Sequence, residues 1–126
     1  MKQGVLAIPQ AEWQENTVNN IDIGRPVAEL EKEFPQFDWT QMDPVFPAKE
    51  GLYEFSQKAL TERGVVARTW LLERKEKVIA VISHDGFMRV GICHRKFGNA
   101  DYRVLISRRM GWDLWNGSRR KRKAAD

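Results

Sequence analysis

The chain has 126 residues, of which 42% are hydrophobic and 30% are charged, and its formal net charge is +4. This composition is typical of one small globular domain, or of part of a larger one, rather than of a disordered chain. The single cysteine, Cys93, excludes an internal disulfide and suits a reducing compartment, which predicts a cytoplasmic location. No apolar run approaches the roughly 20 residues that cross a bilayer, and the apolar stretch at the start is too short for a secretory signal. We therefore expect no membrane partner.

The positive charge is distributed unevenly along the chain. Residues 108–126 contain seven Lys or Arg and two Asp, whereas residues 1–107 contain 14 basic and 15 acidic side chains. This predicts a folded domain over residues 1–107 and a basic, disordered tail over residues 108–126. The run 118–123 resembles a nuclear import signal, so a nuclear location, or contact with nucleic acid through this tail, is the alternative to a purely cytoplasmic protein. We expect no nucleic-acid contact elsewhere.

The sequence of the first third of the chain indicates little regular structure. Val5 to Ile8 could form a short strand, but residues 1–25 otherwise read as a loop that is long for a compact domain. A helix is expected over Val27 to Phe34, because Pro26 suits a first helical turn and Pro35 ends the pattern. The proline- and aromatic-rich residues 35–50 are expected to be extended.

The middle of the chain predicts a βα-type arrangement. Apolar residues at three- and four-residue spacing predict a helix over Glu50 to Arg74. The unbroken apolar run Val78 to Ile82 indicates a buried parallel strand. A further helix is expected over Phe87 to Cys93, and an edge strand over Asp101 to Ile106. A helix that leads into a buried strand is half of a βαβ unit, although no strong first strand precedes it.

The best candidate for chemistry is His84. It belongs to the turn Ser83-His84-Asp85-Gly86, at the predicted carboxyl end of a strand, where open α/β sheets bind ligands. The following helix start would attract an anion such as phosphate. The alternative is a buried histidine that hydrogen-bonds a neighbouring loop. The other histidine, His94, is expected at a helix end, and Cys93 is expected to be a small core residue.

Residues 78–89 resemble the second histidine motif of the histidine phosphatase superfamily, also called the phosphoglycerate mutase-like family. Further stretches are similar to a fungal branch of that family, in the same order along the chain. They are Trp13-Gln14-Glu15, Ile21 to Val27, Leu30 to Pro35, Asp43-Pro44, and Asn99 to Arg103. The resemblance covers residues 9–106. It implies an α/β fold of three layers, α/β/α, with a mostly parallel sheet.

The resemblance also implies a reaction, the hydrolysis of a phosphomonoester through a phosphohistidine. In the family, a histidine in an Arg-His-Gly motif attacks phosphorus, while a second histidine and two arginines hold the phosphoryl oxygens. By position, His84 would be the second histidine. Glu15, or alternatively Glu12, would be the acid that protonates the leaving oxygen. Ser83 and Gly86 would shape the pocket. The expected partner is phosphate or a phosphorylated small molecule, with no metal and no cofactor.

The sequence departs from the family pattern in two respects that bear on activity. Neither His84 nor His94 stands in an Arg-His-Gly, and Ile21 and Ile23 replace a Cys and a Thr of the family pattern. We therefore expect a domain that is incomplete at its amino end and has little or no turnover. The alternative is a pseudophosphatase that still binds anions near His84. Without a first strand, Val78 to Ile82 would lack a pairing partner, and such an edge invites association.

Overall fold

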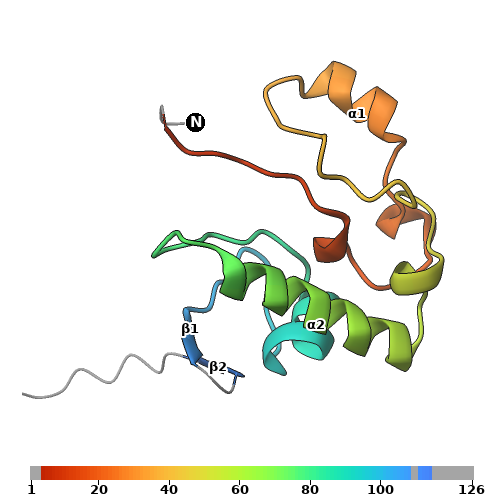
Figure 1. Cartoon of the computed structure of the whole chain (residues 1–126). Coiled ribbons are helices and arrows are strands. Elements are labelled where there is room, and N and C mark those ends of the chain that lie inside the picture. The colour runs from red at the N-terminus through yellow and green to blue at the C-terminus, as the bar shows by residue number, and fades with distance from the viewer. Residues whose placement is uncertain (1–3, 109–110, 115–126) are drawn as a thin grey trace, which may run out of the picture.

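The computed structural model describes residues 4–108 and 111–114, and for residues 107, 108 and 111–114 only the backbone is considered. The described part is mostly helical (Figure 1). Its helices are α1 (Val27–Glu33), α2 (Gln57–Glu73), α3 (Asp85–Phe87), the π-helix η4 (Met88–Cys93), and the 3-10 turns η1 (Ala11–Trp13), η2 (Asn20–Asp22) and η3 (Gly51–Tyr53). Two strands, β1 (Leu105–Arg108) and β2 (Gly111–Leu114), pair as an antiparallel hairpin.

All three predicted helical segments are helical in the structure, the second with a later start and the third partly as a π-helix. The helix α1 follows Pro26 and ends before Pro35, as the prolines predicted. The helix α2 begins at Gln57 rather than at Glu50. The reason is a helix cap, because the Ser56 hydroxyl accepts a hydrogen bond from the Ala59 N–H at 3.2 Å.

The helix that follows His84 is built from α3 and η4, which run on without a break. A helix was predicted here, but its second half is a π-helix, a form that is rare and often occurs at functional sites. His94 ends this helix in the left-handed conformation, with φ of 54°. The predicted helix-end position of His94 is therefore confirmed. Cys93 is half-buried and packs against the core, as expected.

The core forms where α2 crosses the α3–η4 helix, as Figure 1 shows. It consists of Leu60 and Ala67 from α2 with Phe87 and Ile92. The two helix backbones touch, because a Cβ atom added to Gly64 would lie 2.3 Å from the carbonyl oxygen of Gly91. That same carbonyl oxygen accepts a hydrogen bond from the Arg68 guanidinium. The crossing fixes the α3–η4 helix, and with it the residues just before the helix start.

The predicted three-layer α/β/α fold with a mostly parallel sheet is wrong for this chain. Val78 to Ile82, expected to be a buried parallel strand, pairs with no strand among the described residues. Val78 is 89% exposed and Ile82 is 94% exposed. A parallel strand is buried only when neighbouring strands and covering helices surround it. Here the apolar run meets no partner strand in the described chain, so Val78 and Ile82 reach solvent, whereas Val81 is half-buried.

The predicted edge strand is also shifted. Residues 101–104 form no strand, and pairing begins only at Leu105. The pairing is antiparallel, and Leu105 lies opposite Leu114 across the hairpin. The described hairpin therefore does not extend a parallel sheet. Most of the predicted basic tail, including the run 118–123, lies outside the described residues.

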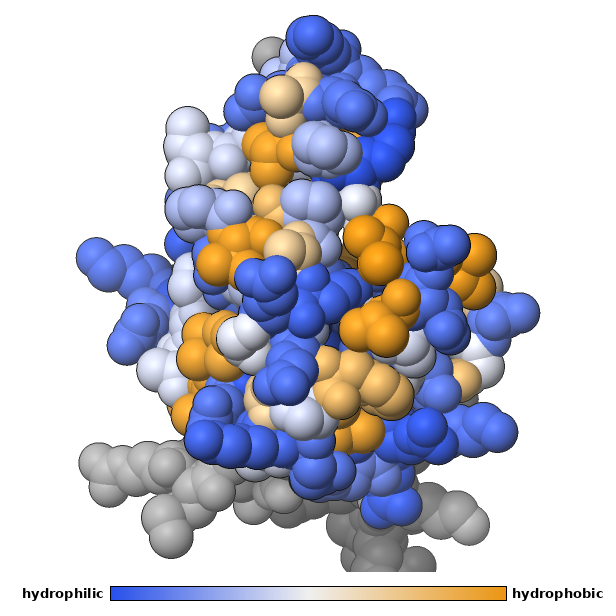
Figure 2. Space-filling view, turned by 90° about the vertical axis from the view of Figure 1, so that its right-hand side faces the viewer, coloured by the Kyte–Doolittle hydropathy of each residue, from blue (hydrophilic) through white to orange (hydrophobic). Residues whose placement is uncertain are grey.

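Figure 2 shows one face of the molecule, on which apolar side chains occur in small groups separated by hydrophilic ones. Such scattered apolar side chains are ordinary for a protein surface. In the described chain, no helix is both long enough and apolar enough to cross a membrane.

Candidate functional site

Two segments that are about 70 residues apart in the sequence meet beside the start of α3. The Ser83 hydroxyl donates a hydrogen bond to the carbonyl oxygen of Trp13 at 2.8 Å. The backbone N–H of Phe87 donates to Oε1 of Glu15 at 3.1 Å. The rings of Trp13 and Phe87 pack edge to face, with centroids 5.9 Å apart. The structure thus brings the loop of Glu15 to the turn that contains His84.

Gly86 allows the carboxylate of Glu15 to come this close. A Cβ atom at Gly86 would lie 2.5 Å from Oε1 of Glu15 and 2.3 Å from Oδ1 of Asn16. Any larger residue would have to displace both groups. Gly86, which was expected to shape a pocket, makes room in this structure for two protein side chains.

The Glu15 carboxylate is held through one oxygen. Its Oε1 accepts from the Phe87 N–H and from the N–H of Asn16 at 2.9 Å, while among the described residues no hydrogen bond reaches Oε2. A carboxylate at a helix start is favoured by the unpaired N–H groups and the helix dipole there. The site therefore presents one anchored and one free carboxylate oxygen.

Lys49 holds the Glu15 loop from the other side. Its Nζ donates to the backbone carbonyl oxygen of Glu15 at 2.6 Å. Partial burial lowers the pKa of Lys49, with a further lowering from the Arg63 charge, against the opposing effect of Asp22 and Glu15. Lys49 was not predicted from the sequence, because no motif around it distinguishes it from the other lysines.

Arg63 lies in the core beneath this site. Its side chain is fully buried, its guanidinium carbon is 4.2 Å from the Phe87 ring centroid, and none of its nitrogens has a hydrogen-bond partner among the described residues. Burial lowers its pKa to about 10, although Tyr53, Glu15 and Glu12 favour the charged form. A charged residue on a helix is normally expected to face solvent. Nothing in the sequence around Arg63 indicated otherwise.

His84 is exposed at the residue before α3, so the alternative of a buried histidine is wrong. Its backbone is extended, with φ of −124° and ψ of 151°, and its carbonyl oxygen accepts from the Met88 N–H at 3.0 Å. Its imidazole makes no helix-capping hydrogen bond. The ring is therefore free to meet a ligand from solvent. Glu12, the alternative acid, is half-buried in η1.

The comparisons with known proteins give one informative match. A Schizosaccharomyces pombe protein described as a probable phosphatase is 38% identical to this chain over 71 residues. The match covers 55% of this chain and 33% of that protein, so the chain spans about a third of the relative it matches. No protein-family model matches the chain, and no solved structure does. The match is therefore to part of a protein described as a probable phosphatase, and it does not show the family that the motifs resemble.

Within residues 4–108 and 111–114 there is no group of three His, Cys, Asp or Glu side chains placed to hold a metal ion.

Proposed function

We propose that this chain carries the phosphoryl-binding half of a histidine-phosphatase-type site and binds phosphate or a phosphomonoester at His84. The observation that carries the proposal is the hydrogen bond from the Phe87 N–H to Glu15. It draws the carboxylate to the helix start that follows His84 directly. The motif order in the sequence and the similarity to a protein described as a probable phosphatase support the same assignment.

The two side chains have complementary roles in this proposal. His84, whose imidazole is exposed, donates a ring N–H hydrogen bond to a phosphoryl oxygen. Glu15, held through Oε1, keeps Oε2 available for the acid role that its position in the family motif implies, a role that it could fill only where a nucleophile attacks the phosphoryl group. Ser83 holds the Glu15 loop through the Trp13 carbonyl oxygen, and Gly86 keeps the space that the carboxylate needs.

Turnover is not part of this proposal. The family reaction needs a second, nucleophilic histidine in an Arg-His-Gly, and the sequence contains no such motif. His94, the other histidine, ends the η4 helix in a left-handed conformation. The chain of 126 residues therefore binds the phosphoryl group without forming a phosphohistidine.

The test is a titration with inorganic phosphate, followed by NMR at the imidazole of His84. We expect the His84 ring resonances to move at millimolar phosphate, and the phosphate-dependent shifts of the neighbouring backbone amides to be lost in His84→Ala. The matched control is His94→Asn, because asparagine tolerates the left-handed conformation of that position. If the His84 resonances do not move, or if His94 moves equally, phosphate binding at this site is excluded.

A second measurement addresses the absence of turnover. The purified 126-residue chain is assayed with a generic aryl phosphate, and no hydrolysis above the blank is expected. Hydrolysis that His84→Ala abolishes would contradict that expectation, because it would require a nucleophile within this chain.

A further inference from the structure

The buried polar atoms that lack a hydrogen-bond partner are gathered in one place. In the described chain there are six such side-chain atoms, and they belong to Gln14, Asn16 and Arg63. Buried polar atoms are nearly always paired, so a cluster of unpaired ones calls for an explanation. Gln14 and Asn16 flank Glu15 in the loop, and Arg63 lies in the core beneath it. The packing of this loop therefore leaves polar groups on both sides of the contact unpaired.

Glu15 and Arg63 lie against the backbone and the ring of the same residue. Oε1 of Glu15 accepts from the Phe87 N–H at 3.1 Å, and the guanidinium carbon of Arg63 is 4.2 Å from the centroid of the Phe87 ring. Burial lowers the pKa of Arg63, and the charge of Glu15 is among those that oppose this effect. A carboxylate with one free oxygen thus lies near a guanidinium that has no hydrogen-bond partner in the described chain.

A phosphoryl group at His84 would compete with Glu15 for the start of the α3–η4 helix. Two anions at one helix start repel each other, and both are attracted by the same backbone N–H groups. A phosphoryl group has more acceptor oxygens and more charge than a carboxylate. It can therefore displace Oε1 of Glu15 from the Phe87 N–H, and the carboxylate then requires another partner.

We infer that phosphate binding at His84 transfers the Glu15 carboxylate from the Phe87 N–H to the buried guanidinium of Arg63. This inference rests on the proposed function. A guanidinium presents five N–H donors in a planar fork that fits a carboxylate. The new ion pair compensates the buried charge of Arg63, which offsets the loss of the hydrogen bond at the helix start. Arg63 is then a positioning residue, which acts on the phosphoryl group through Glu15.

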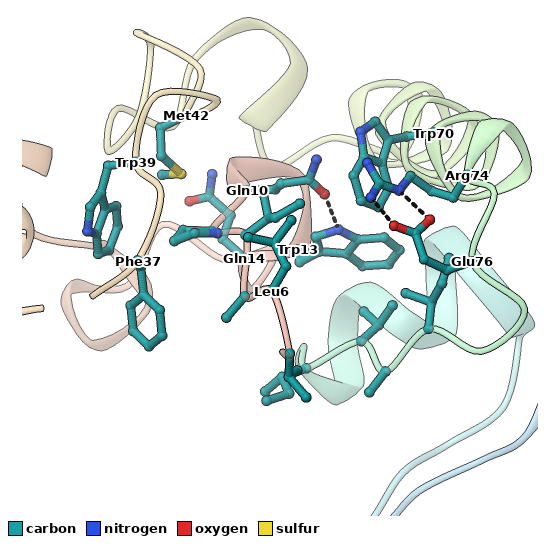
Figure 3. A pocket seen from close by; sticks show the side chains of 18 of the residues that line it. Leu6, Gln10, Trp13, Gln14, Phe37, Trp39, Met42, Trp70, Arg74 and Glu76 are labelled. Carbon is teal, nitrogen blue, oxygen red and sulfur yellow. Dashed lines mark hydrogen bonds and ion pairs between the residues drawn. The ribbon is translucent and has the colours of Figure 1, made fainter. Parts of the chain in front are cut away.

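The main chain on both sides of the Glu15 side chain is held in place during this transfer. Ser83 donates to the carbonyl oxygen of Trp13, and Lys49 donates to the carbonyl oxygen of Glu15 at 2.6 Å. Figure 3 shows the Trp13 indole hydrogen-bonded to Gln10, in an apolar groove of about 860 Å³ that both residues line. The loop therefore stays anchored, and only the Glu15 side chain has to rotate.

Glu12 provides a charge-matched comparison. It is the other carboxylate that favours the charged form of Arg63 against the effect of burial on its pKa. It lies in η1, and in the described chain it makes no hydrogen bond to the start of α3. A phosphoryl group at His84 therefore does not displace Glu12. Removing the charge of Glu12 should leave the coupling between Arg63 and the phosphoryl group intact.

The test is a double-mutant cycle on the full chain, in which the affinity for inorganic phosphate is measured by NMR titration. Arg63→Met should weaken phosphate binding by about fivefold or more, because the displaced carboxylate finds no partner. In a Glu15→Gln background the same substitution should lose this effect, since a neutral amide is not repelled from the helix start. In a Glu12→Gln background the effect should persist. An equal loss in the Glu15→Gln background, or no loss in any background, would overturn the inference.

The Arg63 side chain of the wild type gives a second readout that needs no substitution of Arg63. On addition of phosphate, the Nε–H resonance of Arg63 should move as the guanidinium gains a carboxylate partner, and Glu15→Gln should abolish the movement. If the resonance moves equally in Glu15→Gln, phosphate itself contacts Arg63 and the transfer is contradicted. If phosphate shifts His84 but not Arg63, this inference alone fails. If phosphate shifts neither residue, the proposed function fails with it.

Discussion

Oε1 of Glu15 lies 3.1 Å from the backbone nitrogen of Phe87, a residue 72 positions further along the chain. The contact connects a loop that has almost no regular structure to the start of the helix that packs on α2. Together with the Ser83 hydroxyl bond to Trp13, it explains why a long segment without its own core keeps a defined place. The loop keeps its place because Glu15 caps the start of the α3–η4 helix.

Replacing Glu15 should show how much this contact contributes. In Glu15→Ala the Phe87 N–H loses a charged acceptor, so we expect a loss of about 1–3 kcal/mol in the free energy of unfolding. Urea unfolding followed by circular dichroism measures it. Glu31→Ala, at an exposed position of α1, should change stability by less than about 0.5 kcal/mol. Equal effects of the two variants would mean that the helix start does not depend on Glu15.

The glycine pair at the helix crossing gives a second prediction. Gly64→Ala should destabilise the protein by about 1–3 kcal/mol, because its Cβ would lie 2.3 Å from the Gly91 carbonyl oxygen and the helices would have to separate. The gain in helix propensity, about 1 kcal/mol, does not offset this. Thermal or urea unfolding measures the change. Val65→Ala, on the exposed side of the same helix, is the control, and a stabilised Gly64→Ala would show that the crossing is loose.

Because of Tyr53, we predict that the free energy of unfolding falls at alkaline pH. Burial, and then the hydrogen bond from its hydroxyl to Asp43 at 2.8 Å, raise the pKa of Tyr53 well above its usual value near 10.0. The folded state therefore keeps a proton that the unfolded chain releases. The stabilisation from Tyr53 is complete below pH 10 and is lost as the pH rises further. Tyr53→Phe should flatten this fall, and phenolate absorbance of the wild type should show one tyrosine ionising only on unfolding.

The burial of Arg63 leads us to predict that replacing this residue increases the free energy of unfolding. Its buried guanidinium has no hydrogen-bond partner among the described residues, and its stacking on Phe87 contributes only about 2 kcal/mol. Because the desolvation of a buried ion costs several kcal/mol, Arg63→Met should raise the free energy of unfolding by about 1 kcal/mol or more.

The pH dependence checks this explanation. The folded-state pKa of Arg63 is lowered to about 10 from 12.5. Above pH 10 the guanidinium of the folded wild type therefore loses its proton, and the cost of burying its charge disappears. The advantage of Arg63→Met should therefore shrink as the pH rises above 10. A variant that is less stable at neutral pH would show instead that the guanidinium has a partner, such as a buried water.

Local signals in the sequence predicted the parts of the fold that depend on local chemistry. Pro26 and Pro35 predicted α1, and the turn at His84 predicted the helix after it. The apolar run Val78–Ile82 predicted a buried strand, but burial depends on partner strands, and the described chain supplies none. A strand's environment is a property of the whole sheet, which no short pattern contains.

The sequence likewise predicted only some of the residues of the candidate site. His84 was predicted from the turn that contains it and Glu15 from the family resemblance, and the structure brings their segments together. Lys49 and Arg63 were not foreseen, because a lone lysine in a loop and an arginine on a helix have no distinctive local pattern. Their importance comes from burial and from neighbours distant in sequence.

The π-helix at Met88–Cys93 has a consequence for how this chain tolerates changes in length. A π-helical turn holds one residue more than the α-helical path it replaces. Deleting one residue there converts the turn to α-helix and leaves both flanking ends nearly in place. The same deletion within α2 would rotate everything beyond it by about 100° and move Gly64 away from Gly91. Among related sequences, a single-residue gap should therefore be tolerated in η4 and excluded from the middle of α2.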